Sequence, residues 1–359
     1  MNTIFHFTES LGGGVLTSVK NLTEVQSASN YEVSLVFLRR PDTPTTIDLQ
    51  LVFPGVKLFE IGHSGPMGFL KLHSFALRIL ISKKNDVIHA HSSWAGVLVR
   101  LANVFLRTSK CFYTPHGYAH LRTDVSIWKR KLFRIIEVFL NLASKTRVIS
   151  CGPTEAKIAS QLFSRAVTSS NNYLKDPFPK WGIIHPQITR DVNKFKVATV
   201  GRITPQKGPE RYLRATKFFD NYVESEWIGG GTEGNLLAIN NVKITGWLRP
   251  DDVAEKLSKL DALLITSEWE GLSMVGLEAL SYGVPIISWS YYGCEDLVKH
   301  GYNGYICYSE EEFAIYISKL HRDSKLHKSM KSNARTYFLE TFDQKKLFQN
   351  WRKLYRADI

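Results

Sequence analysis

The sequence predicts an α/β protein built from two doubly wound, Rossmann-like domains that face each other across a cleft. Strand-like runs alternate with helical patterns through both halves, beginning with Thr3 to Phe7, a glycine turn and a helix from Val15. The chain has 359 residues, 44% of them hydrophobic, which is enough to bury two cores. A polar stretch broken by prolines, Asn171 to Asn193, is expected to link the domains. We therefore expect one domain over residues 1–180 and a second over residues 190–341.

The positive charge of the chain is concentrated in its first half. The formal net charge is +13. Residues 1–190 contain 23 Lys and Arg against 11 Asp and Glu, a balance of +12, whereas residues 191–359 contain 23 against 22. A basic domain beside a nearly neutral one indicates that the first domain meets an anionic partner.

No stretch of the sequence is apolar enough to cross a membrane, which takes about 18 consecutive apolar residues. The nearest candidate, Phe69 to Ser82, is interrupted by Lys71 and Arg78. The strand-like start lacks the basic region of a signal peptide, so none is expected. The cysteines have no metal-binding spacing and suit a reduced compartment. They are Cys111, Cys151, Cys294 and Cys307.

A strand-to-helix transition in the second half, Ser267 to Gly283, carries the strongest functional signal. Gly271 breaks an apolar strand, and helix-forming residues follow from Met274 to Tyr282. This places Glu270 in the turn and Glu278 in the helix. At the helix start, the backbone N–H groups of Leu272, Ser273 and Met274 favour a bound anion. Two carboxylates beside such a site suit a ligand with hydroxyls and phosphates, such as a nucleotide sugar, and solvated surface charges are the alternative.

A second cluster of functional residues runs from Gly201 to Gly208, after the strand that opens the second domain. Arg202 and Lys207 precede Pro209, which is expected to start a helix. Two cations near a helix N-terminus oppose the helix dipole, an arrangement that is favourable if an anion lies between them. Simple solvation of both cations is the alternative.

Two features of the first half fall at expected strand ends, where open α/β sheets bind their ligands. Gly12, Gly13 and Gly14 form a turn after the first strand, without the spacing of the dinucleotide-binding fingerprint. His116 ends a later strand just before Gly117, where it either meets a ligand or is simply packed.

A histidine pair in the first half raises the question of a metal. His89 and His91 share one face of a buried strand because side chains alternate along a strand. We expect no metal there, because the sequence offers no nearby carboxylate or third ligand, and zinc sites use three or four.

The two motifs of the second half resemble the signatures of retaining GT-B glycosyltransferases, specifically glycosyltransferase family 4. The first is E-G-x(6)-E-A followed by G-x-P, from Glu270 to Pro285, and the second is G-R-x(4)-K-G. In the first half, the T-P-H-G run that ends at Gly117 is also similar to the family. Ser273 and Val275 replace a Gly and a Pro of the signature, but those contacts are mostly made by the backbone.

The resemblance implies roles for individual residues. Glu270 would contact the donor sugar's hydroxyls and Glu278 the ribose of the nucleotide, while Arg202 and Lys207 would clasp the diphosphate. His116 would lie beside the donor sugar. Glu270, His116, Arg202 and Lys207 are thus the expected catalytic residues. Further donor-binding residues are expected at the helix start and in two loops that flank the base: Gly271, Leu272, Ser273, Met274, Gly230 and Thr245.

The implied activity is transfer of a hexose or N-acetylhexosamine, commonly from a UDP-sugar, to a hydroxyl of a glycan or polyprenyl-diphosphate-linked glycan in cell-surface polysaccharide or lipopolysaccharide biosynthesis. Residues 1–180 would bind the acceptor and residues 190–341 the donor. The amphipathic segment 342–359 would cross back onto the first domain. No D-x-D motif is present, so cationic side chains are expected to replace a metal ion, and no cofactor is expected.

A basic, aromatic helix expected at Ser126 to Leu142 points to a membrane surface. Its cations, Lys129, Arg130, Lys131 and Arg134, alternate with large apolar residues. Such a helix can lie in a membrane interface against anionic lipid. We expect a cytoplasmic protein bound peripherally to the inner face of the cell membrane; an ordinary core helix with a solvated basic face is the alternative.

Two rival functions remain open from the sequence. A GT-B sugar-nucleotide epimerase shares the architecture and donor site but uses no acceptor. A nucleic-acid-binding protein would explain the basic charge, although the sequence contains no recognisable nucleic-acid-binding module.

Overall fold

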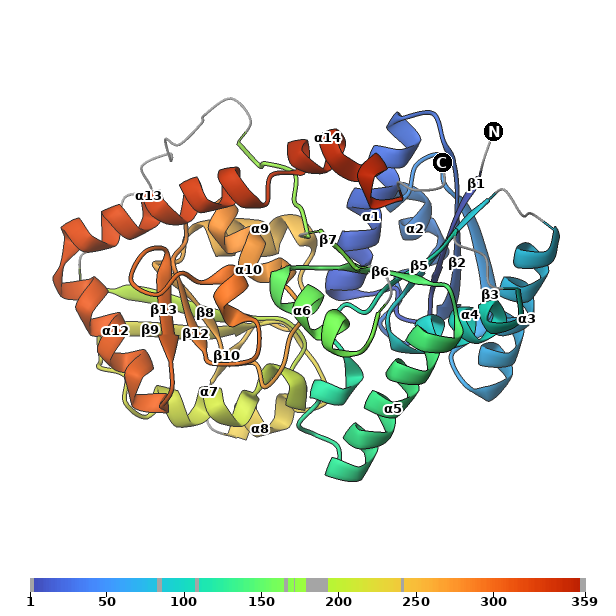
Figure 1. Cartoon of the computed structure of the whole chain (residues 1–359). Helices are drawn as coiled ribbons and strands as arrows, with labels where there is room; N and C mark the ends of the chain where they lie inside the picture. The colour runs from blue at the N-terminus through green and yellow to red at the C-terminus, as the bar shows by residue number, and fades with distance from the viewer. Residues whose placement is uncertain are drawn as a thin grey trace. The chain divides into compact units, whose positions relative to one another are not determined.

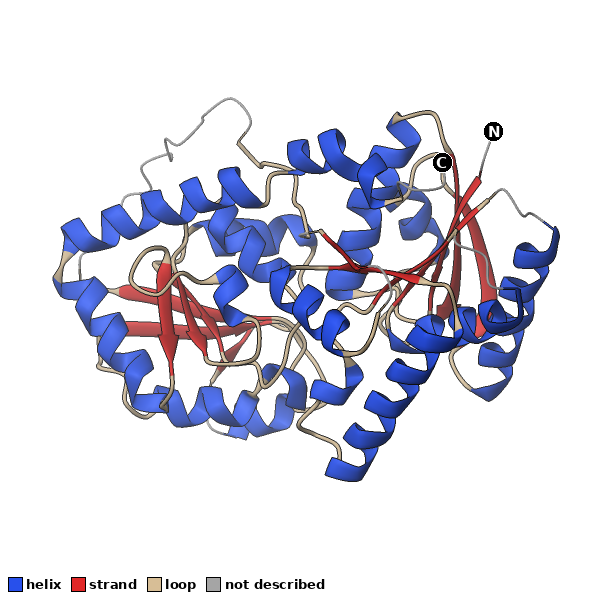
Figure 2. Cartoon of the chain, viewed as in Figure 1, coloured by secondary structure: helices blue, strands red, loops and turns tan. Residues whose placement is uncertain are grey.

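The computed structural model describes residues 3–82, 86–106, 110–164, 167–170, 172–178, 193–239 and 242–355. These residues form two compact α/β units (Figures 1 and 2). Unit 1 comprises residues 1–173 and 344–359, and unit 2 comprises residues 174–343. Most of the expected linker lies outside the described residues.

Unit 1 is built around a parallel seven-stranded sheet with the strand order β3-β2-β1-β4-β5-β6-β7. Its strands are β1 (Thr3–Thr8), β2 (Glu32–Arg39), β3 (Lys57–His63), β4 (Val87–His91), β5 (Cys111–Thr114), β6 (Arg147–Ser150) and β7 (Val167–Ser169). Its helices are α1 (Gly13–Ala28), α2 (Thr46–Val52), α3 (Pro66–Ser82), α4 (Ser93–Leu106), the 3₁₀ turn η1 (Ala119–Leu121), α5 (Ile127–Ala143), α6 (Pro153–Gln161) and α14 (Gln344–Leu354). This is the doubly wound fold that the sequence predicts.

The strand order of unit 1 reverses at β1, which pairs with β2 on one side and β4 on the other. Open sheets place their ligand sites at the carboxyl ends of strands beside such a switch point. The register sets His6 opposite His89, and His91 opposite Thr114 at the end of β5. Histidines from two neighbouring strands are thereby brought to one region of the sheet.

The last helix, α14, packs within unit 1 against α1. Trp351 and Tyr355 at its end are buried in an apolar cluster with Ile4 and Phe112 of the sheet. The helix begins at Gln344 rather than at residue 342, because Phe342 still closes the last turn of the preceding helix.

Unit 2 has a parallel six-stranded sheet with the order β10-β9-β8-β11-β12-β13. The strands are β8 (Phe195–Val200), β9 (Val223–Ile228), β10 (Lys243–Ile244), β11 (Ala262–Ile265), β12 (Ile286–Trp289) and β13 (Gly304–Cys307). The helices are the 3₁₀ turn η2 (Pro205–Lys207), α7 (Pro209–Thr216), α8 (Gly234–Ile239), α9 (Pro250–Ser258), α10 (Met274–Ser281), α11 (Cys294–Leu297), α12 (Glu310–Arg322) and α13 (Ser324–Thr341). β8 and β11, whose ends carry the two predicted motifs, are neighbours in this sheet.

Candidate active site

In unit 2, the structure joins the two predicted motifs through a direct ion pair. The Lys207 Nζ donates to Glu270 Oε1 at 2.5 Å, and Ser267 Oγ donates to the same oxygen at 2.8 Å. Both charged side chains are largely shielded, with 19% of Lys207 and 9% of Glu270 exposed. When a ligand binds, such a cation can pair with a charged group of the ligand instead, and the carboxylate can accept hydrogen bonds from the ligand's hydroxyls.

Backbone contacts lock these two loops together. Gly208 has a left-handed φ of 64°, and a Cβ at this position would lie 2.1 Å from the Thr266 carbonyl oxygen. Thr266 Oγ1 in turn donates to the Lys207 carbonyl. The Arg211 guanidinium donates to the Thr266 carbonyl and to Glu268. Glycine at 208 is therefore required for the close approach that places Lys207 beside Glu270.

Helix α10 begins at Met274, directly after the Glu270 turn. Ser273 caps it by accepting from the Gly276 amide at 3.4 Å. Leu272, Ser273 and Met274 are buried, while Gly271 is partly exposed. The predicted helix start is thus present beside the ion pair, with its positive end in the same loop region.

Glu278 lies one turn into α10 and is partly buried. Burial raises the pKa of its carboxyl to about 7, and the nearby charge of Lys207 opposes this rise. This carboxyl therefore changes its charge near neutral pH. Such a group can gain a compensating hydrogen bond when a hydroxyl-bearing ligand arrives.

Two further loops of unit 2 end at the same edge of the sheet. Gly230 follows β9, and its backbone carbonyl accepts from the Ile203 amide in the Arg202 loop. Thr245 follows β10 and accepts from the Gly229 amide through its Oγ1 at 3.1 Å. The predicted residues Arg202, Gly230 and Thr245 therefore belong to one connected set of loops.

The predicted residues of unit 1 lie at the carboxyl edge of its sheet. Gly12 precedes α1, where an added Cβ would meet the Asp42 carbonyl oxygen at 2.9 Å, and Gly13 has a φ of 52°. Gly14 lies in the first turn of α1. His116 follows β5 with a φ of 54°, which is unusual for a residue with a side chain. Backbone strain of this kind is concentrated at functional sites.

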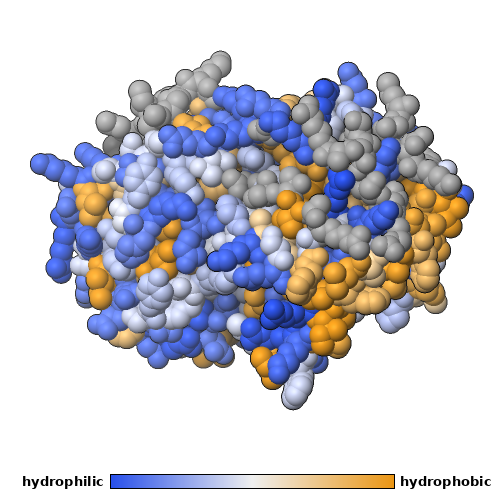
Figure 3. All heavy atoms as spheres, in the orientation of Figure 1, coloured by the Kyte–Doolittle hydropathy of each residue, from blue (hydrophilic) through white to orange (hydrophobic). Residues whose placement is uncertain are grey.

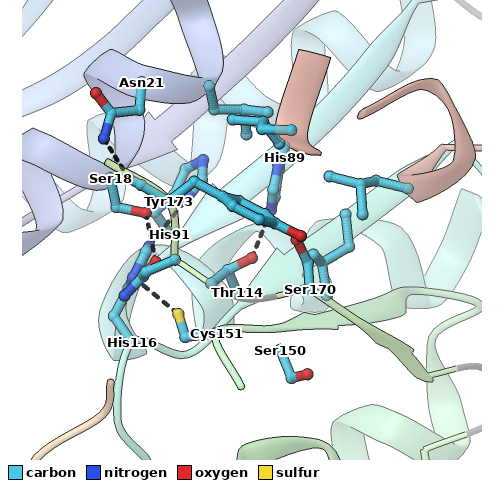
Figure 4. Close-up of a pocket in the computed structure, with 15 residues that line it drawn as sticks. Ser18, Asn21, His89, His91, Thr114, His116, Ser150, Cys151, Ser170 and Tyr173 are labelled. Atoms are coloured by element: carbon cyan, nitrogen blue, oxygen red, sulfur yellow. Dashed lines mark hydrogen bonds between the residues drawn. The ribbon is translucent and has the colours of Figure 1, made fainter. Parts of the chain in front are cut away.

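His116 belongs to a chain of hydrogen bonds through the interior of unit 1 (Figure 4). His91 Nδ1 lies 3.0 Å from His116 Nε2, and His6 Nδ1 lies 2.9 Å from His91 Nε2. The chain ends at Gln26 on one side and at Cys151, 3.3 Å from His116 Nδ1, on the other. Both ring nitrogens of His116 therefore have partners within unit 1.

The expectation that no third ligand lies near His89 and His91 is wrong. A third histidine, His6 of β1, lies beside His89 and His91, and ligand atoms of the three all lie within 4.8 Å of one another. The β1–β4 pairing creates this cluster, so sequence spacing alone could not reveal it. His89 and His91 do share one face, as predicted, with ring centroids 4.0 Å apart.

Burial favours the neutral form of all four histidines. It lowers the pKa of His6 and of His116 to about 4. The pKa values of His89 and His91 are also well below the usual range, mainly through burial and secondarily through the neighbouring histidines. The cluster therefore carries no net charge at neutral pH.

A small cavity of about 40 Å³ lies beside this chain. Polar groups from α1, β4, β5 and β6 line it, including Ser18, Asn21, Thr114 and Ser150 (Figure 4). A cavity of this size and polarity is suited to a few water molecules, since one water needs about 10–15 Å³.

Two buried carboxylates that the sequence did not single out hold this edge of unit 1. Glu155 accepts from the Gly117 amide at 2.7 Å and from the Cys151 amide at 2.6 Å. Glu9 accepts from the amides of Trp94 and Ala95 at the start of α4. The only sequence signal for these roles is position: Glu9 directly follows the first strand, and Glu155 lies in the first turn of a helix.

Two family models match most of the chain. Residues 12–166 match the model described as Glycosyltransferase Family 4, and residues 182–337 match the model described as Glycosyl transferases group 1. The two family models and the fold together show a nucleotide-sugar glycosyltransferase with the GT-B fold. The chain belongs to glycosyltransferase family 4.

The chain is also similar to curated relatives in sequence and to solved structures in fold. The chain is 27% identical over 324 residues to an uncharacterised 41.2 kDa protein of the cps region of Klebsiella pneumoniae, covering 87% of each chain. It is also 27% identical to an Escherichia coli UDP-Gal:alpha-D-GlcNAc-diphosphoundecaprenol alpha-1,3-galactosyltransferase, covering 77% of each. Among solved structures, it is similar to Anabaena Alr3699/HepE in complex with UDP, with a TM-score of 0.73, 19% identity and coverage of 98% and 99%. Sucrose-phosphate synthase from Thermosynechococcus elongatus gives 0.79 at 17% identity, covering 99% of this chain and 98% of that one.

Proposed function

We propose that this protein is a retaining glycosyltransferase that moves a hexose or N-acetylhexosamine from a UDP-sugar to a polyprenyl-diphosphate-linked glycan during cell-surface polysaccharide synthesis. The observation that carries this proposal is the shielded Lys207–Glu270 pair in front of α10. The printed name of the Escherichia coli relative describes a transfer of this kind, from UDP-galactose to a diphosphoundecaprenol-linked sugar. Unit 2 would bind the donor and unit 1 the acceptor.

The chemical task is to stabilise negative charge that grows on the leaving diphosphate. Arg202, Lys207 and the positive end of α10 would supply this stabilisation, with Glu270 positioned for the hydroxyls of the sugar. Cationic side chains can perform this task without a metal ion. Glu278, whose carboxyl lies deeper in α10, would accept hydrogen bonds from the ribose.

A thermal-shift screen of nucleotide sugars tests the donor assignment, because a ligand that binds the folded state raises the melting temperature. We expect UDP-hexoses or UDP-N-acetylhexosamines to stabilise the protein and GDP-, ADP- and CMP-sugars to have little effect. Incubation with the stabilising donor alone provides the control, since an epimerised nucleotide sugar would identify an epimerase instead. Stabilisation by a non-uridine donor would contradict the UDP assignment.

The proposal that unit 1 meets an anionic membrane rests on the orientation of α5. This helix buries Glu137, Leu140 and Asn141 and half-buries Phe133 and Ile136, but it leaves most of its large apolar residues exposed. The exposed apolar residues are Ile127, Trp128, Leu132, Ile135, Phe139 and Leu142. An ordinary core helix would bury these side chains and expose the carboxylate, so the orientation of α5 supports the membrane proposal over a core helix.

The apolar face continues from α5 onto two neighbouring helices, α3 and α4, as Figure 3 shows in orange. Phe105 is 84% exposed, and Trp94, 52% exposed, stacks on Phe69 of α3. Every exposed charged side chain that the structure describes on the three helices is positive: Lys71, Arg78, Lys129, Lys131 and Arg134. Cations around an apolar patch are suited to an interface with anionic lipid. Among the described residues, no helix is long and apolar enough to span a membrane.

Liposome sedimentation tests the membrane proposal. We expect binding to vesicles that contain anionic lipid, weak binding to neutral vesicles and release by high salt, because screening shortens the reach of surface charge. Replacement of Lys129, Lys131 and Arg134 with Gln should abolish binding. The matched control replaces Lys217, Lys325 and Lys328, which are exposed in unit 2, with Gln. Equal loss in both triple variants, or no binding by the wild-type protein, would contradict a specific lipid-facing surface.

A further inference from the structure

The hydrogen bonds inside unit 1 form one uninterrupted chain whose direction is set by an amide. Gln26 accepts on Oε1 from His6 Nε2 at 2.8 Å, and its Nε2 donates to the Tyr355 hydroxyl at 3.0 Å. A carbonyl oxygen can only accept. His6 must therefore carry its proton on Nε2, which leaves its Nδ1 as an acceptor.

The same reasoning determines which ring nitrogen carries the proton in each later histidine of this hydrogen-bond chain. His91 donates from Nε2 to His6 Nδ1, and His116 donates from Nε2 to His91 Nδ1. The Nδ1 of His116 then accepts from the Cys151 thiol. All three histidines are neutral, and the chain leaves none of their ring nitrogens without a partner.

A branch of the network runs the other way from Gln26. The Tyr355 hydroxyl donates to His89 Nδ1 at 2.9 Å, and His89 Nε2 donates to Thr114 Oγ1 at 2.8 Å. His89 is as deeply buried as His91 but makes no hydrogen bond to His116. It therefore provides an internal control for effects of burial alone.

We propose that the line Gln26–His6–His91–His116–Cys151 is a positioning network that holds the His116 ring in one orientation and in the Nε2–H tautomer. His91 and Cys151 are then positioning residues, and this role rests on the proposed function of His116. Because His91 and Cys151 already occupy both ring nitrogens, the neutral His116 ring presents a fixed face to a substrate and can act neither as a free hydrogen-bond donor nor as a cationic acid. The network also accounts for the His6, His89 and His91 cluster without a metal ion, because each ring nitrogen already has a directional partner.

Nitrogen-15 NMR of histidine side chains tests the network without any substrate. We expect four neutral histidines with protons on Nε2, which stay neutral down to about pH 5 because burial holds their pKa values low. Protons on Nδ1 would reverse the chain and contradict the proposal. Binding of one equivalent of Zn²⁺ or Co²⁺, lost on His6→Asn, would overturn it in favour of a metal site.

Paired variants separate positioning from packing. Cys151→Ala removes the donor to His116, whereas Cys151→Ser keeps one. We expect Cys151→Ala to change the His116 nitrogen signals and to lower kcat about tenfold with donor KM nearly unchanged, a loss typical of one displaced catalytic group. Cys151→Ser should restore both readouts. A loss of stability with unchanged His116 signals, in Cys151→Ala and His91→Gln alike, would show that the network only packs.

Two further variants distinguish failure of the network from failure of the proposed function. His89→Asn should lower the melting temperature but leave the His116 signals in place. His116→Ala should fold and turn over poorly. If His116→Ala retains full activity, the proposed role of His116 fails, whereas the NMR spectrum still decides whether the network exists.

Discussion

Lys207 is the residue on which the donor site depends most directly. It is held against Glu270 by a loop contact that only Gly208 permits. Lys207→Ala removes a charge from the growing diphosphate anion, which should raise the barrier by about 2–4 kcal/mol, as for other single electrostatic donors. We expect kcat to fall by the corresponding factor while the fold persists. Steady-state kinetics with Lys217→Ala as an exposed control check this, and near-normal turnover would exclude the diphosphate clasp.

Glu278 predicts a pH dependence of nucleotide binding. Its pKa is raised to about 7 by burial, so the carboxylate form that accepts ribose hydroxyls becomes dominant above neutral pH. The affinity for UDP should therefore increase from pH 6 to pH 8. Titration calorimetry of Glu278→Gln, which cannot ionise, corrects for ionisation of the nucleotide itself. An identical pH dependence in the wild type and the variant would show that Glu278 does not contact the nucleotide.

Helices and turns with a local sequence signal could be predicted from the sequence. The parts of the site that depend on which strands pair could not. The helix that begins at Met274 and the turn at Glu270 follow from glycine and periodicity. His6 joined the histidine cluster only because β1 pairs with β4, and Glu155 acts on a loop 38 residues away. The exposed apolar face of α5 could not be predicted either, because periodicity predicts an apolar stripe on a helix but not whether that stripe faces the core or the solvent.

A buried ion pair holds α5 against α4 with its apolar face exposed. Arg100 of α4 donates to both carboxylate oxygens of Glu137, at 2.8 and 3.0 Å, and Arg100 is fully buried. Arg100→Met would leave Glu137 as an unpaired buried charge, which costs about 3–5 kcal/mol. We expect a large fall in denaturant midpoint. The double variant Arg100→Met with Glu137→Met should recover much of the loss, and equal destabilisation in both would contradict this account of α5.

At the scale of the whole molecule, the buried histidines predict loss of stability in mild acid. The pKa of His6 falls from 6.5 in the unfolded chain to about 4 when folded. The unfolded state then binds more protons between these values, so stability falls as the pH drops from 6.5 towards 4. For His6 alone the loss between pH 7 and pH 5 is about 2 kcal/mol.

Four other histidines with lowered pKa values act in the same direction as His6, and two shielded carboxyls with raised pKa values, Glu9 and Glu278, act against them. The histidines outnumber the carboxyls, so the net effect is destabilisation on acidification. Chemical denaturation at pH 7, 6 and 5 measures it. Glu278→Gln should show a steeper loss, and stability that is constant or rises towards pH 5 would mean that the histidines are not held neutral.

The most direct test of the central claim is the affinity of the protein for UDP, measured by calorimetry in the presence of EDTA. It requires neither the identity of the sugar nor that of the acceptor. If the donor diphosphate lies between Arg202, Lys207 and the start of α10, UDP binds the wild-type protein without metal, and Lys207→Ala weakens binding by about tenfold or more, as expected for loss of one charge-assisted contact. Absence of UDP binding by the wild-type protein, or equal affinity in the variant, would contradict the account.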